Sequence, residues 1–118
     1  MKPPRFQYCA PDILDDALNL LEQKGDEAKV LAGGQSLVPL LNMRLAQPGY
    51  LLDINRISEL NYIEAEADYV AIGATVRQSQ AEHSFLLQER HPLLIEAIWH
   101  IGHAQIRNRG TIVGSIAH

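Results

Sequence analysis

A pair of adjacent glycines directly after a short apolar run constrains the fold of this chain more than any other feature. The run is Lys29 to Ala32, and Gly33-Gly34 ends it. Such a run is typical of a buried strand, and the glycines allow a tight turn with positive φ angles. Ser36 can then cap a short helix whose first turn tolerates Pro39. The segment therefore predicts a strand, a glycine turn and a helix in succession.

The neighbouring segments extend this unit into a small lobe. Residues 6–10 and 50–54 have strand-like composition. A helix is expected after the first of these strands, with Asp12 as its N-cap and its end at Lys24-Gly25. The apolar face of that helix, which we expect to cover a sheet, consists of Ile13, Ala17, Leu18 and Leu21. The order strand, helix, strand, short helix, strand predicts a parallel βαβ lobe over residues 1–57.

The pattern changes after residue 57. Residues 60–64 and 69–73 are strand-like and joined by a short polar link, which predicts an antiparallel hairpin. Thr75 and Gln78 have the spacing of a capping box and predict a short helix through Glu82.

The remaining sequence predicts one more helix and a final strand. Pro92 starts a segment that is apolar nearly all round, so we expect a buried helix that contains Trp99 as a core residue and stops near Gly102. Residues 111–117 are strand-like and are followed only by His118. A strand at a terminus needs a partner. Residues 58–118 are therefore expected to be the first, incomplete part of a second α+β lobe with mixed or antiparallel strands.

Composition excludes several classes of function. The formal net charge of −4 removes the electrostatic attraction on which most nucleic-acid binding depends. Cys9 is the single cysteine, so no intrachain disulfide or cysteine cage can form. No export signal or membrane span is visible, which favours a cytoplasmic location. Histidines could in principle ligate a metal here, but no H-E-x-x-H pattern supports such a site and none is predicted. The histidines in question are His100 and His103 with His91 or His118.

The glycine turn is also the first candidate binding site. Glycines let a backbone approach a ligand, and successive N–H groups before a helix favour an anionic phosphate. The same residues are also compatible with an ordinary turn between a strand and a helix, without a binding role. The segment does not continue as a Rossmann or P-loop fingerprint, and Val38 stands where a G-x-S-x-G elbow needs glycine.

A second candidate lies between Gln105 and His118. Arg107 and Arg109 can neutralise charge, and Thr111 and Ser115 can donate hydrogen bonds to phosphate oxygens. A solvated basic turn followed by a strand explains the same residues.

Together the two segments resemble the FAD loops of molybdenum-hydroxylase flavoproteins, the family of the carbon monoxide dehydrogenase medium subunit and of xanthine dehydrogenase. The first segment is Ala32-Gly33-Gly34-Gln35-Ser36-Leu37, with Pro39-Leu40 and Arg44 behind it. The second consists of Ile106-Arg107-Asn108 and of Thr111 to Ser115. The resemblance extends over nearly the whole chain and includes Asp53-Ile54, Ile72-Gly73-Ala74 and Ile101-Gly102.

The resemblance implies a fold of the vanillyl-alcohol oxidase and para-cresol methylhydroxylase type, in which FAD is held between two α+β lobes and both glycine loops hold its pyrophosphate. It implies no catalytic side chain and no metal ligand in this chain. Val113 departs from the pattern, since the family usually has a glycine pair there, and its Cβ narrows the approach to phosphate. The implied cofactor-binding residues are Ala32, Gly33, Gly34, Gln35, Ser36, Leu37, Ile106, Arg107, Thr111, Ile112, Val113, Gly114 and Ser115.

The function implied is that of the FAD-binding electron-transfer subunit of a molybdenum hydroxylase. Its partners would be an iron–sulfur small subunit, which delivers electrons, and a molybdopterin large subunit. The acceptor would be a nicotinamide nucleotide, a quinone or oxygen. Because the family continues past His118 with an Asp-containing loop and another domain, we expect a truncated chain that is inactive by itself. The alternatives are a non-catalytic interaction module derived from such a flavoprotein, or another flavoenzyme of similar fold, such as a reductase of cell-wall precursor synthesis.

Overall fold

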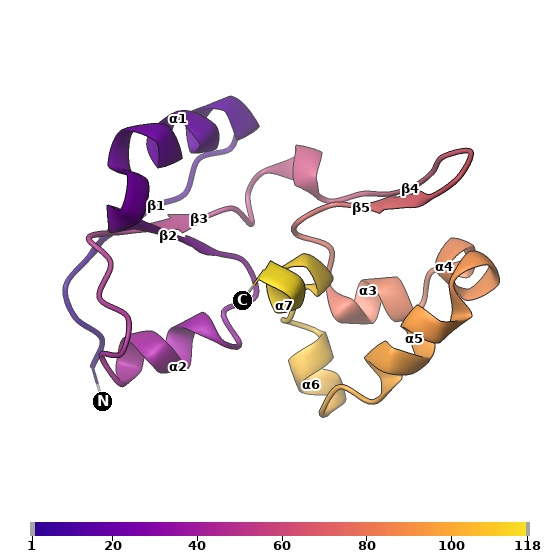
Figure 1. Ribbon diagram of the computed structural model, residues 1–118. Helices are drawn as coiled ribbons and strands as arrows, with labels where there is room; N and C mark the ends of the chain where they lie inside the picture. The colour runs from indigo at the N-terminus through magenta and orange to yellow at the C-terminus, as the bar shows by residue number, and fades with distance from the viewer. Residues whose placement is uncertain (1, 118) are drawn as a thin grey trace. The chain divides into compact units, whose positions relative to one another are not determined.

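A computed structural model describes residues 2–117 of the chain (Figure 1). Its residues divide into two compact units, one ending at Glu59 and the other beginning at Leu60. Both contain helices and strands, so the predicted α+β class is confirmed. Among the described residues, no helix is both long enough and apolar enough to cross a membrane.

The first unit is built on a parallel sheet of three short strands. Its elements are β1 (Gln7–Cys9), α1 (Leu14–Lys24), the 3₁₀ turn η1 (Gly25–Glu27), β2 (Ala28–Leu31), α2 (Leu37–Asn42) and β3 (Tyr50–Asp53). The strand order is β1-β3-β2, which confirms the predicted parallel βαβ arrangement. The central strand β3 supplies the buried residues Leu51 and Leu52. Leu31 pairs with Asp53, so the carboxyl ends of the parallel strands β2 and β3 lie side by side.

Four local predictions in this unit need correction. The helix α1 begins at Leu14, and Ile13 rather than Asp12 occupies the N-cap position, without a side-chain cap. Of its apolar face only Ala17 is buried, while Ile13 and Leu18 are about half exposed. The strand β2 lies at an edge of the sheet, so Val30 is exposed rather than buried. Ser36 does precede α2 as its N-cap residue, but its side chain accepts no capping hydrogen bond.

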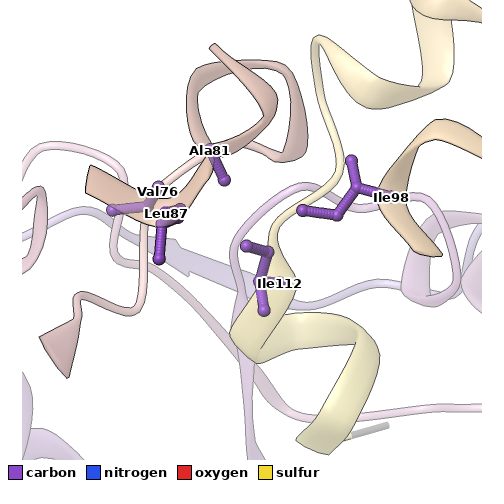
Figure 2. Close-up of a cluster of buried hydrophobic side chains, with 5 residues drawn as sticks. All are labelled: Val76, Ala81, Leu87, Ile98 and Ile112. Atoms are coloured by element: carbon purple, nitrogen blue, oxygen red, sulfur yellow. The ribbon is translucent and has the colours of Figure 1, made fainter. Parts of the chain in front are cut away.

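The second unit combines a hairpin with short helices. After the 3₁₀ turn η2 (Ser58–Leu60), β4 (Ile63–Ala65) and β5 (Val70–Ile72) form the predicted antiparallel pair. The helices are α3 (Gln78–Glu82), α4 (Phe85–Arg90), α5 (Pro92–Trp99), α6 (Ala104–Arg107) and α7 (Ile112–Ala117). Figure 2 shows a buried cluster that joins four of these helices, α3, α4, α5 and α7, and is formed by Val76, Ala81, Leu87, Ile98 and Ile112.

The end of this unit differs most from the sequence-based expectation. Residues 111–117 form the helix α7 instead of a strand, and Thr111 makes only an isolated bridge with Arg77. The Thr111 Oγ1 accepts a hydrogen bond from the Gly114 N–H at 3.0 Å, the arrangement of a threonine N-cap. This cap starts a helix in a sequence whose β-branched residues favour a strand.

Other expectations for the second unit also need correction. The helix α3 starts at Gln78, with Arg77 rather than Thr75 as its N-cap. The helix α5 starts at Pro92 as predicted but is not a buried helix: it ends at Trp99, which is 65% exposed and so is no core residue.

Candidate functional site

The first glycine loop joins β2 to α2, and its backbone can be approached closely by a ligand. Gly34 has a φ of +80°, and a Cβ there would lie 3.0 Å from the Val38 Cγ2 and 3.3 Å from the Leu31 Cδ1. The carbonyl of Gly34 accepts the Val38 N–H at 3.0 Å. Within the described chain, the backbone N–H groups of residues 33–36 donate to no protein acceptor. The loop therefore presents free amides around a position that only glycine suits.

The end of β3 braces this loop from the neighbouring strand. The Asn55 Nδ2 donates to the Ala32 carbonyl at 2.8 Å and to the Asp53 Oδ1 at 2.7 Å. The backbone N–H of Asn55 donates to the same carboxylate oxygen at 2.9 Å. The other oxygen of Asp53 accepts a hydrogen bond from the Tyr8 hydroxyl. A network that spans β1 and β3 thus holds the residue at which the glycine loop begins.

This network shifts the acidity of both of its titratable groups. Burial is the largest influence on Asp53 and acts to raise its pKa, but the hydrogen bonds from Tyr8 and Asn55 together lower the pKa below 3.8. The hydrogen bond to Asp53 raises the pKa of the Tyr8 hydroxyl above 10.0. Asp53 is therefore held as a carboxylate that accepts three hydrogen bonds.

The second segment is a turn closed by its own side chains. The Gly114 N–H donates to the Thr111 Oγ1, and the Ser115 N–H donates to the Thr111 carbonyl at 3.2 Å. Thr111 and Ile112 are buried, Val113 and Gly114 are half-buried, and Ser115 is exposed. A Cβ at Gly114 would lie 2.5 Å from the Thr111 Oγ1, so the capped turn requires glycine at this position. Its accessible part is Val113 to Ser115.

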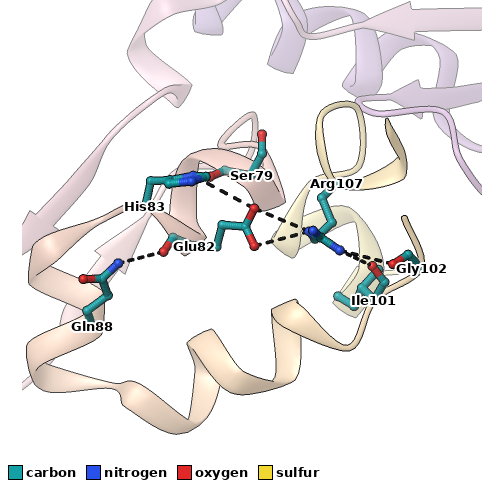
Figure 3. A network of polar contacts seen from close by, with 7 residues as sticks. All are labelled: Ser79, Glu82, His83, Gln88, Ile101, Gly102 and Arg107. Carbon is teal, nitrogen blue, oxygen red and sulfur yellow. Dashed lines mark hydrogen bonds and ion pairs between the residues drawn. The ribbon is translucent and has the colours of Figure 1, made fainter. Parts of the chain in front are cut away.

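Arg107 is held inside the second unit. Its Nε lies 3.3 Å from the Glu82 Oε2, and its Nη1 donates to the carbonyls of Ile101 and Gly102 at 3.1 and 3.2 Å (Figure 3). Its guanidinium also lies over the Trp99 ring, 5.3 Å from the centroid. The Arg107 side chain is only 10% exposed. These contacts indicate that Arg107 supports the turn that follows it, rather than offering a free charge to a ligand.

The structure thus places the predicted site residues in two groups. Ala32 to Leu37 form one turn in the first unit. In the second unit, Ile106 and Arg107 belong to α6, and Thr111 to Ser115 form the start of α7. No cluster of three metal-ligating side chains occurs in the described part of the chain. His118 lies outside the described residues.

Sequence reasoning missed two residues that support the loops. Asn55 contacts Ala32, and Gln78 contacts the turn at Thr111 and Ser115. The signal for Asn55 was its position just after β3, because the carboxyl ends of adjacent parallel strands lie together and commonly form ligand sites. Gln78 gave no such signal, since its partners lie more than 30 residues away.

The chain is similar to known proteins along nearly its whole length. Residues 4–118 match the model of the family described as "FAD binding domain in molybdopterin dehydrogenase". The chain is 50% identical over its whole length to the 6-hydroxypseudooxynicotine dehydrogenase complex subunit alpha of Paenarthrobacter nicotinovorans, of which it covers 40%. It is 51% identical, over 100% of its length and 41% of the other, to the solved carbon monoxide dehydrogenase from Hydrogenophaga pseudoflava, with a TM-score of 0.95.

A further solved structure, quinoline 2-oxidoreductase from Pseudomonas putida 86, is 38% identical with a TM-score of 0.94, and the match covers 100% of this chain and 41% of that one. The chain therefore spans about two fifths of the length of the relatives it matches.

Proposed function

Because the chain belongs to the family of FAD-binding domains of molybdopterin dehydrogenases, we propose that it is the part of a molybdenum hydroxylase flavoprotein that binds the FAD diphosphate. The family assignment confirms FAD as the cofactor that the sequence implied. The observation that carries the proposal is the first glycine loop, whose positive-φ Gly34 and free amides suit a phosphate group. Ala32 to Leu37 would contact the cofactor there.

The turn at Thr111 is the second proposed contact. The half-buried Val113 and Gly114 and the exposed Ser115 would face the cofactor, while the buried Thr111 and Ile112 keep the turn in shape. Arg107 and Ile106 act through the position of this turn, since the Arg107 guanidinium is engaged by Glu82 and two carbonyls.

When bound, FAD supplies the electron chemistry, and the protein supplies binding and orientation. We therefore assign no acid, base or nucleophile to this chain. In the proposed role, electrons arrive from an iron–sulfur small subunit paired with a molybdopterin large subunit. They leave to a nicotinamide nucleotide, a quinone or oxygen, in the cytoplasm. Relatives named as medium chains or complex subunits support the assembly.

A flavin titration tests the proposal. The purified protein should show the flavin absorption bands or acquire them on titration with FAD, and reduced flavin in it should be reoxidised by one of the three acceptors. Absence of flavin and of binding at high FAD concentration would reject the cofactor role. Binding without reoxidation by any acceptor would reject the electron-transfer role alone.

A second candidate is a non-catalytic interaction module. The observations that favour it are Val113 at a position where the family usually has glycine, and the large apolar side chains that the second unit exposes, Phe85, Leu93 and Trp99. Such a module would bind partner subunits without FAD. Co-purification of flavin-free protein with its partners would favour this candidate over the first.

A further inference from the structure

Gln78 is the most buried polar side chain that the proposed site leaves unused. It is the first residue of α3 and only 3% exposed. Its backbone N–H donates to the Gly110 carbonyl at 2.8 Å. Its Nε2 donates to the Ser115 Oγ at 3.0 Å and lies 3.5 Å from the Thr111 carbonyl. One residue therefore contacts the turn before, at and after its cap.

Two further contacts show that the start of α3 is fitted to this turn. A Cβ at Gly110 would lie 3.0 Å from the Gln78 Oε1, so glycine is what lets the amide pack against the backbone. The neighbouring Arg77 donates from Nη1 to the Arg109 carbonyl at 2.6 Å and forms the isolated bridge with Thr111. The backbone on both sides of Gly110 is thus fixed by two consecutive residues.

Of the two polar atoms of the Gln78 side-chain amide, only Nε2 has hydrogen-bond partners. Within the described residues its buried Oε1 has no hydrogen-bond partner. A buried acceptor without a donor lowers stability, and an apolar side chain of similar length avoids that loss. The Thr111 carbonyl also accepts from the Ser115 N–H and hydroxyl, so it does not depend on Gln78 for a partner. Fold stability alone therefore does not explain a glutamine here.

We propose that Gln78 is a positioning residue that holds residues 110–115 in the conformation that receives the cofactor phosphates. The proposal rests on the proposed function and deepens it, since it names what keeps the second contact in place. The Nε2 group orients the Ser115 hydroxyl, and the side chain as a whole sets where the turn begins.

The test compares Gln78→Met with Gln80→Met, a matched control at an exposed position of the same helix. Both variants and the unaltered protein are titrated with FAD and with ADP, which carries the diphosphate without the flavin. They are also unfolded with urea in the absence of ligand. Gln78→Met should weaken FAD and ADP binding at least about tenfold and leave the urea midpoint unchanged or raised. Gln80→Met should change neither quantity.

Hydrogen exchange gives a readout without ligand. Amides in residues 110–115 should exchange faster in Gln78→Met than in the other two proteins. Unchanged exchange there, or a fall in affinity that only parallels a fall in the urea midpoint, would overturn the positioning role. Equal FAD affinity in Gln78→Met and the unaltered protein would also overturn the positioning role, but it would leave the proposed function standing. Failure of the unaltered protein to bind FAD would refute both the positioning role and the proposed function.

Discussion

At the scale of single residues, Gly34 carries a strict steric requirement in the first loop. Gly34→Val combines an unfavourable positive φ with a Cβ that meets Val38 and Leu31. We expect at least about tenfold weaker FAD binding and a loss of about 1–3 kcal/mol in the free energy of unfolding. Gly25→Val is the matched control, because Gly25 also has positive φ but its Cβ would meet nothing within 4 Å. Equal affinity in the two variants, measured by flavin titration, would contradict the assigned loop.

Val113 offers a change in the opposite direction. Val113→Gly removes the Cβ that, by the resemblance to the family's FAD loops, narrows the approach to phosphate, so FAD affinity should rise several-fold. The variant should also lose roughly 0.5 kcal/mol of stability, because glycine is a poorer helix former than valine and Val113 lies in α7. Ala117→Gly in the same helix controls for that loss. An affinity that does not rise in Val113→Gly would show that this side chain does not limit phosphate approach.

The Asp53 network predicts a specific pH dependence. Hydrogen bonds from Tyr8 and Asn55 lower the pKa of Asp53 in the folded protein, so its contribution to stability is present above 3.8 and is lost as the pH falls through the folded value. The urea midpoint of the unaltered protein should therefore fall more steeply in acid than that of Asp53→Asn. Asp12→Asn, at an exposed position, should keep the unaltered profile. Parallel profiles for all three proteins would argue against the network.

At the scale of elements, the link between α3 and α6 depends on one buried ion pair. The side chains of Arg107 and Glu82 are only 10% and 9% exposed. Arg107→Met would leave a buried carboxylate without its partner, so we expect a loss of about 3–5 kcal/mol in the free energy of unfolding. Adding Glu82→Gln should recover part of it, and Arg109→Met, at an exposed position, should cost little. Urea unfolding measures all four proteins, and a double variant no better than the single would refute the pairing.

The elements also show what sequence patterns can and cannot predict. The strands β1, β3, β4 and β5 were found from short apolar runs between polar turns, and α2 from the glycine turn before it. The helix α4 was missed although Ser84 caps it by accepting the Leu87 N–H at 3.3 Å. Its signal was a single serine in front of a six-residue helix.

The helix α7 was missed for a different reason. Its β-branched residues favour a strand. The helix forms instead because Thr111 caps it and because Gln78, from a distant part of the chain, donates to Ser115. The same long-range contacts explain why the residues of the two loops were predictable while their supports were not. Glycines and hydroxyls mark a loop locally, but Asn55 and Gln78 act across 23 and 37 residues of sequence.

At the scale of the whole molecule, each unit carries one of the proposed FAD contacts. A ligand that binds only the folded protein raises its stability by an amount set by concentration and affinity, about 2.7 kcal/mol at a hundred times the Kd. Saturating FAD should therefore raise the Tm of the unaltered protein by several degrees. If each unit supplies part of the binding energy, a variant in either unit should reduce that rise.

The decisive comparison uses one glycine from each unit. Gly34→Val alters the first loop, and Gly114→Ala places a Cβ 2.5 Å from the Thr111 Oγ1 and so displaces the cap of the second. Thermal unfolding is followed with and without FAD, so that the ligand-dependent rise in Tm is separated from each variant's own loss of stability. Both variants should show a smaller rise than the unaltered protein and than Gly25→Val. A full rise in Gly114→Ala would confine FAD binding to the first unit, and the turn at Thr111 would then be a structural feature alone.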